Sequence, residues 1–192
     1  MPSDLAPAEP VHALLAAEPK LHEVVLAIAA QLDPDRIGTG PLAALRRLDP
    51  DPAKGGGLST PALQRLLWRY VPDAWLTGEA MHQWALIVHA MAVGAPDLHI
   101  TSGSKGRLGS ALFAAGFSEG RLVRFLEATA VDLPVAVPRA VRFLAAKRQG
   151  FDCVSLARWV RGIAAGGPRA EGERKAVASD YFRAEREAGK AA

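Results

Sequence analysis

The sequence is poor in the residues and patterns that mark several common protein classes. It has one cysteine, Cys153, with no Cys or His at ligand spacing, so we expect neither an internal disulfide nor a metal site. No apolar run approaches the roughly 18–20 residues that cross a bilayer, and the acidic, proline-broken first 19 residues do not resemble a signal peptide. We therefore predict a cytoplasmic protein without membrane contact.

Catalytic patterns are also missing. There is no GxSxG elbow, no Walker-type loop, no glycine dinucleotide fingerprint and no grouping of carboxylates that would suit a nuclease. His82 and His89 are seven residues apart and lack a third ligand, so we expect structural roles for both, and we expect Cys153 to be a buried thiol. The prediction is a protein that is not an enzyme, with no catalytic residue, no cofactor and no small-molecule substrate.

Helical periodicity dominates the apolar pattern. In the first half we predict helices over 21–32, from Thr39 to the prolines at 50 and 52, from Thr60-Pro61, and from Thr77. In the second half we predict helices from 108, from Ser118, from near Pro138, from Asp152, and after the glycine-proline break at 166–168. No segment is a convincing strand, because prolines bracket the one β-like stretch, 132–137. The fold class predicted is all-α.

A loop-rich segment at 95–104 separates the chain into two parts. We predict two small helical bundles joined by this short linker, an N-terminal one over 11–95 and a basic C-terminal one over 104–190. Residues 1–100 contain seven Lys/Arg against eleven Asp/Glu, whereas 101–192 contain sixteen against nine. This asymmetry indicates that the second part meets a polyanion, although a solvated basic surface would give the same count.

Arginine pairs recur on three successive predicted helices of the second part. Their members lie three residues apart, so each pair forms one surface patch, and guanidinium groups match phosphate oxygens in geometry. The pairs are Arg121/Arg124, Arg139/Arg142 and Arg158/Arg161, and Lys105, Arg107, Lys147 and Arg148 add to them. Pairing with carboxylates such as Glu119 and Glu127 is the competing interpretation. Few exposed aromatics accompany the pairs, so contact with the phosphate backbone is favoured over base stacking.

The first part has one notable basic pair, Arg46-Arg47, on a helix whose leucines face inward. Nucleic-acid contact and ordinary surface charge both fit this pair.

Three segments occur in a recognisable order. They are residues 40–47 (GPLAALRR), residues 108–122 (LGSALFAAGFSEGRL), and Phe151-Asp152 with Leu156-Ala157 and the terminal 180–182 (DYF). Together they resemble the CasB family, the small subunit of the type I-E CRISPR Cascade complex. Their order and spacing carry the resemblance, since each segment is short.

The resemblance implies two helical bundles, no catalysis, and two copies of the chain within a ribonucleoprotein with the other Cascade subunits. There the subunit is expected to help hold the duplex of CRISPR guide RNA with target DNA, and the displaced strand. By matching position it implies contacts from Arg46 or Arg47, Lys105, Arg107, Arg121, Arg142 and Arg158. Backbone contacts fit a guided system, in which base pairing reads the sequence.

We thus expect nucleic-acid contacts from ten residues: Arg46, Arg47, Lys105, Arg107, Arg121, Arg124, Arg139, Arg142, Lys147 and Arg158. The main alternative is a free-standing helical DNA-binding transcription regulator, with residues 103–130 as its nearest helix-turn-helix candidate. An all-α enzyme is a third hypothesis, which the absence of an acid–base cluster argues against.

Overall fold

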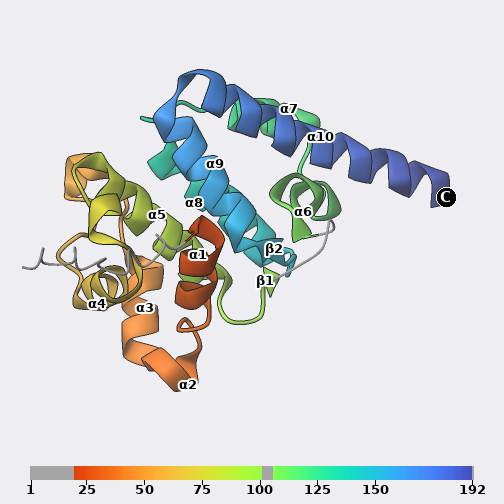
Figure 1. The fold of residues 1–192 in the computed structure, drawn as a ribbon. Coiled ribbons are helices and arrows are strands. Elements are labelled where there is room, and N and C mark those ends of the chain that lie inside the picture. The colour runs from red at the N-terminus through yellow and green to blue at the C-terminus, as the bar shows by residue number, and fades with distance from the viewer. Residues whose placement is uncertain (1–19, 101–105, 192) are drawn as a thin grey trace, which may run out of the picture.

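The computed structural model describes residues 20–100 and 106–191, and this part of the chain is mostly α-helix (Figure 1). The helices are α1 (Leu21–Ala29), α2 (Pro34–Ile37), α3 (Thr39–Arg47), α4 (Pro61–Tyr70), α5 (Glu79–Gly94), α6 (Leu108–Ala114), α7 (Glu119–Leu126), α8 (Leu133–Ala146), α9 (Cys153–Ala165) and α10 (Gly167–Ala191). Two 3₁₀ turns, η1 (Pro52–Lys54) and η2 (Asp73–Trp75), precede α4 and α5. The all-α prediction is confirmed.

Helix α5 lies at the centre of the packing. Every residue from 84 to 92 is buried, because α3, α4, α8 and α9 all pack against it. An amphipathic surface helix would bury only one stripe, so this helix is enclosed rather than half-solvated. The α3 stripe of Leu42 and Leu45 and the α4 stripe of Leu63 and Leu67 supply the facing apolar side chains.

Helix α10 runs along α6 and α9 on the other side of the molecule (Figure 1). Gly109 permits the close approach to α6, since a Cβ at this position would lie 2.1 Å from the carbonyl oxygen of Val177. Tyr181 is buried and its hydroxyl donates to the carbonyl of Phe117, which ties α10 to the start of α7. At the head of α9, the Asp152 carboxylate accepts from the backbone N–H of Val154 at 2.8 Å, as predicted for an N-cap.

Buried side chains from both halves of the chain form one continuous core. Helix α5 packs on α8 and α9, and α1 packs on α9, so helices from before and after residue 100 share their apolar faces. The division into bundles over 11–95 and 104–190 stays a prediction about independent folding. Its outer limits at 11–19 and 104–105 lie outside the described residues.

Helix α8 begins earlier than the sequence suggested. It starts at Leu133, not near Pro138, with Pro134 in its first turn and Pro138 inside it. Proline is well tolerated in the first turn, and an internal proline removes one backbone hydrogen bond. Leu133, Val137 and Val141 are buried along this helix, so apolar packing offsets the missing bond.

Other boundaries differ by small amounts. Helix α1 ends at Ala29, and Leu32 is buried from the turn that follows it rather than from the helix. Asp33-Pro34 does not simply end a helix, because Asp33 caps the short α2. Helix α5 begins at Glu79 after Gly78, two residues beyond the predicted Thr77 cap. A two-residue parallel pair, β1 (His99–Ile100) with β2 (Phe151–Asp152), was not predicted, since so short a pairing leaves no alternation in the sequence.

Candidate nucleic-acid interface

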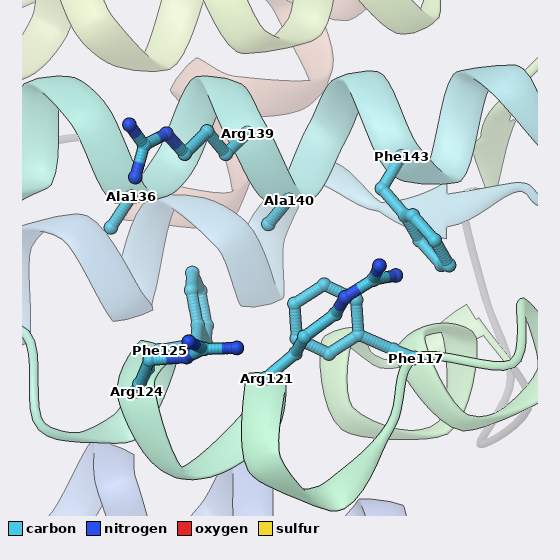
Figure 2. A pocket seen from close by; sticks show the side chains of 8 residues that line it. All are labelled: Phe117, Arg121, Arg124, Phe125, Ala136, Arg139, Ala140 and Phe143. Carbon is cyan, nitrogen blue, oxygen red and sulfur yellow. The ribbon is translucent and has the colours of Figure 1, made fainter.

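Three of the predicted arginines line one groove between α7 and α8. Arg121 and Arg124 come from α7 and Arg139 from α8, and the groove has a volume of about 450 Å³ (Figure 2). Its remaining lining is apolar: Phe117, Phe125, Ala136, Ala140 and Phe143. We call these eight residues the α7–α8 groove.

The local sequence explains why these arginines face outward. On α7 the buried residues are Leu122 and Phe125, which leaves Arg121 and Arg124 on the exposed side. On α8 the buried residues include Ala140 and Val141, and Arg139 is exposed beside them. Each helix follows the usual amphipathic rule, and the two exposed edges meet across the groove.

No carboxylate of the described residues lines the groove. Among the described residues, Arg121, Arg124 and Arg139 take part in no ion pair, and neither Glu119 nor Glu127 approaches one of them within 4.0 Å. Asp132 and Glu127 line an adjoining hollow with Arg124 and Arg139. The Asp132 carboxylate accepts from the N–H and hydroxyl of Thr129, at 2.9 and 2.6 Å, and these bonds lower its pKa.

One aromatic ring of the groove wall contacts an arginine. The Arg121 guanidinium carbon lies 5.2 Å from the centre of the Phe143 ring, within the range of a cation–π contact. Phe143 is half-buried and forms part of the groove wall. In the sequence Phe143 lies next to Leu144, a residue of the apolar stripe of α8, so the pattern alone does not distinguish a residue of the groove wall from a core residue.

The basic surface continues from the groove toward α3. Arg139 also lines a second hollow of about 370 Å³, together with Arg142 and Arg47. Asp49 and Asp51 border this hollow, and both pair with Lys54, at 3.1 and 3.7 Å. Residues 47 and 142, far apart in sequence, are thereby brought into one surface with the α7–α8 groove.

Arg46 does not join this surface. Its side chain donates to the carbonyl oxygens of Ala92 at 2.9 Å and Ala95 at 2.6 Å. These carbonyls lie at the C-terminal end of α5, where the last turn leaves acceptors unsatisfied. Arg46 is therefore a cap for a neighbouring helix, and of the predicted pair only Arg47 faces the basic surface.

The third arginine pair also fails to converge. The Arg161 guanidinium carbon lies 5.3 Å from the Trp75 ring and 5.5 Å from the Trp84 ring, so this side chain packs inward. Arg158 is exposed on α9, and its positive charge opposes the rise that burial causes in the pKa of Glu173 on α10. Helix α9 is flanked by α1, α5 and α10, so neighbouring helices contact residues that an isolated helix would leave in solvent.

The remaining predicted contacts are scattered. Arg107 pairs with Asp180 of α10 at 3.3 Å. Lys147 is exposed at the C-terminal cap of α8 and does not line the α7–α8 groove. Lys105 lies outside the described residues.

Cys153 and His89 are the buried titratable groups that would be considered for catalysis or metal binding. Burial raises the pKa of the Cys153 thiol to about 12, which leaves it protonated and unreactive at neutral pH. His89 is fully buried and donates from Nδ1 to the carbonyl of Leu45 at 3.0 Å, and burial lowers its pKa. Over residues 20–100 and 106–191, no three His, Cys, Asp or Glu side chains are grouped as metal ligands, and no helix is long and apolar enough to cross a bilayer.

Comparisons with known proteins agree with this architecture. Residues 41–182 match the family model described as CRISPR-associated protein Cse2. The crystal structure of M. ruber CasB superposes with a TM-score of 0.60 at 18% sequence identity, over 91% of this chain and 99% of that one, which shows a similar fold. No curated protein sequence matches the chain. Since the family match covers most of the chain, this protein belongs to the CRISPR-associated Cse2 (CasB) family and is a CRISPR Cascade subunit.

Proposed function

We propose that this Cascade subunit binds the phosphate backbone of nucleic acid through the α7–α8 groove and the adjoining surface of Arg142 and Arg47. The observation that carries the proposal is the convergence of Arg121, Arg124 and Arg139 from two helices on one groove without an ion-paired carboxylate among the described residues. Guanidinium groups keep their charge at any physiological pH and present paired donors to phosphate oxygens. An anionic chain lying in the groove would satisfy these donors.

The composition of the groove favours sequence-independent contact. Arginine can bond guanine as well as phosphate, but the lining has no Asn, Gln, Asp or Glu that would read the edge of another base. Contacts of this kind position a nucleic acid without specifying its sequence, and they weaken as salt rises. This suits a guided complex, in which pairing with the guide supplies the specificity.

Within the complex, the proposed ligands are the CRISPR guide RNA with its target DNA and the displaced strand. The proposed protein partners are the other Cascade subunits and a second copy of this chain. The subunit is proposed to act in the cytoplasm as a binding and scaffolding protein without catalysis. Family membership and the basic groove support this role over the free-standing transcription regulator.

The test is target binding by the assembled complex. Complexes are purified with the wild-type subunit, with Arg121→Ala/Arg124→Ala/Arg139→Ala, or with Arg183→Ala/Arg186→Ala/Lys190→Ala. The second variant removes the same charge from exposed positions near the end of α10. We expect the groove variant to weaken target-DNA binding at least about tenfold, and the α10 variant by less than about threefold. Equal losses in the two variants, with both variant subunits incorporated, would contradict the proposal.

A further inference from the structure

A second basic surface lies on the N-terminal half, where α2 meets α4. Arg36 of α2 and Arg65 and Arg69 of α4 line a hollow of about 220 Å³. The other lining residues are Gln31, Ile37, Pro41, Ala62, Leu66 and Tyr70, and none of them is acidic. We call this site the α2–α4 hollow.

The three arginines of this hollow have no side-chain partner in the described part of the chain. None of them takes part in an ion pair or a side-chain hydrogen bond there, and all three are exposed. The contact found for them is Arg69 over the Tyr70 ring, at 5.6 Å. In contrast to Arg46 on α3, these side chains do not serve as helix caps. Three cations gathered around one hollow repel one another unless an anion joins them.

Trp68 supplies a second, independent observation beside the hollow. It is 57% exposed, whereas Trp84 and Trp159 are fully buried and Trp75 is half-buried. Its indole Nε1 donates to the Gln64 Oε1 at 2.7 Å, which holds the ring against the outer side of α4. Arg65 lies one turn before Trp68 and Arg69 directly follows it, so the indole borders the arginines on the helix surface.

We propose that this surface is a separate binding site for single-stranded nucleic acid, with phosphates on Arg36, Arg65 and Arg69 and a base stacked on Trp68. Arginines beside an exposed aromatic ring are the combination that binds unpaired strands, because every base has a stacking face and every linkage a phosphate. A duplex buries its base faces and could use only the arginines. The α2–α4 hollow lies on helices distant from α7 (Figure 1), so the proposal does not rest on the function proposed for the α7–α8 groove.

The test measures oligonucleotide binding by the intact chain, using fluorescence anisotropy at low salt. The probes are an oligothymidylate of about 20 nucleotides, a duplex of equal length, and an abasic oligonucleotide of equal length. The variants are Trp68→Ala, Arg36→Ala/Arg65→Ala/Arg69→Ala, and the charge-matched Arg183→Ala/Arg186→Ala/Lys190→Ala. Each is also made in the Arg121→Ala/Arg124→Ala/Arg139→Ala background, which removes the groove contribution. Circular dichroism checks that each variant keeps its helical content.

Trp68→Ala is expected to weaken oligothymidylate binding about fivefold or more in the groove-deficient background, and to leave abasic binding unchanged. The α2–α4 arginine variant is expected to weaken binding of both single strands beyond the loss in the charge-matched variant. Equal losses in the two arginine variants, or an equal effect of Trp68→Ala on both oligonucleotides, would overturn the proposal. Unchanged oligonucleotide binding with loss of another Cascade subunit from the purified complex would also overturn it, and would assign the surface to a protein partner.

Discussion

Arginines of the same kind serve two different purposes in this molecule. On the α7–α8 side, Arg121, Arg124 and Arg139 face a groove and have no ion-paired carboxylate among the described residues. Elsewhere, Arg46 and Arg174 bind backbone carbonyls at the C-terminal ends of α5 and α7. The role of each arginine depends on whether the fold brings helix-end carbonyls of another segment within reach of its guanidinium group.

Arg174 is the clearest example of an arginine that binds helix-end carbonyls. Its Nε donates to the carbonyl of Leu126 at 2.7 Å and its Nη2 to that of Ala128 at 3.0 Å, at the C-terminal end of α7. Glu171 holds the remaining nitrogen. Three of the five N–H donors of this guanidinium are used within the protein, so positive charge alone does not identify a nucleic-acid contact.

The largest expected effect comes from removing the two arginines that bind backbone carbonyls. Arg46→Ala/Arg174→Ala should lower the free energy of unfolding by about 4 kcal/mol, because each substitution removes two hydrogen bonds from a charged donor to helix-end carbonyls. The two sites are far apart, so their effects should add. Urea unfolding followed by circular dichroism measures the change.

Nucleic-acid affinity provides the contrast in that variant. Measured on folded protein, it should stay within about twofold of wild type, since backbone carbonyls hold both guanidinium groups and neither residue lines the α7–α8 groove. If Arg46→Ala/Arg174→Ala lost much of its affinity for nucleic acid while its stability stayed normal, the distinction between carbonyl-binding arginines and groove arginines would be wrong.

Arg139→Ala should produce the largest binding loss of any single groove substitution. Arg139 lines both the α7–α8 groove and the hollow of Arg142 and Arg47, so it joins the two parts of the surface. We expect affinity for single-stranded DNA to fall about three- to tenfold, with the melting temperature unchanged. The affinities of Arg121→Ala and Arg142→Ala for the same oligonucleotide are measured for comparison. If Arg139→Ala lost less affinity than each of these two variants, the two parts would not form a joined surface.

The smallest expected effect is that of the exposed Arg142 on the pKa of the buried His89. Burial lowers the pKa of His89 below its ordinary 6.5, and the nearby positive charge of Arg142 lowers it further. Below pH 6.5 the unfolded chain therefore binds more protons at this site than the folded chain, so the free energy of unfolding decreases as pH falls. His99 is buried and shifted in the same direction, and it adds to this decrease.

Arg142→Ala should raise the His89 pKa and so reduce the loss of stability on acidification. The change should be a few tenths of a kcal/mol between about pH 7 and 5, measured by thermal unfolding across pH. Arg139→Ala is the control, because its charge is not among those acting on His89. An equal acid dependence in wild type and Arg142→Ala would show that the charge of Arg142 does not reach the core.

Local signals in the sequence were enough to predict the all-α class and most helix starts. The Thr39, Pro61 and Asp152 starts agree with α3, α4 and α9, because capping and proline chemistry act within a few residues. The start of α8 was wrong, since burial of Leu133 and Val137 outweighs the internal proline. Tertiary packing determines where a helix with an internal proline begins, and the local sequence pattern does not contain that information.

The candidate site was predictable only in part. The spacing of Arg121/Arg124 and Arg139/Arg142 identified exposed edges of two helices correctly, because the buried stripes beside them were clear. At Arg158/Arg161 the same spacing does not place both side chains outward, since Arg158 is exposed whereas Arg161 packs against Trp75 and Trp84 from distant segments. The α2–α4 hollow was missed because its arginines come from two helices, with Arg36 lying 29 residues before Arg65, in the half of the chain where acidic residues predominate.

The most direct test of the central claim is the salt dependence of single-stranded DNA binding by wild-type protein and by Arg121→Ala/Arg124→Ala/Arg139→Ala. If these guanidinium groups neutralise phosphates, the slope of log affinity against log salt should become shallower by about two in the variant, because each neutralised phosphate of a single strand adds roughly 0.7 to the slope. An unchanged slope, with the variant folded and its affinity measurable, would show that these arginines do not bind the phosphate backbone.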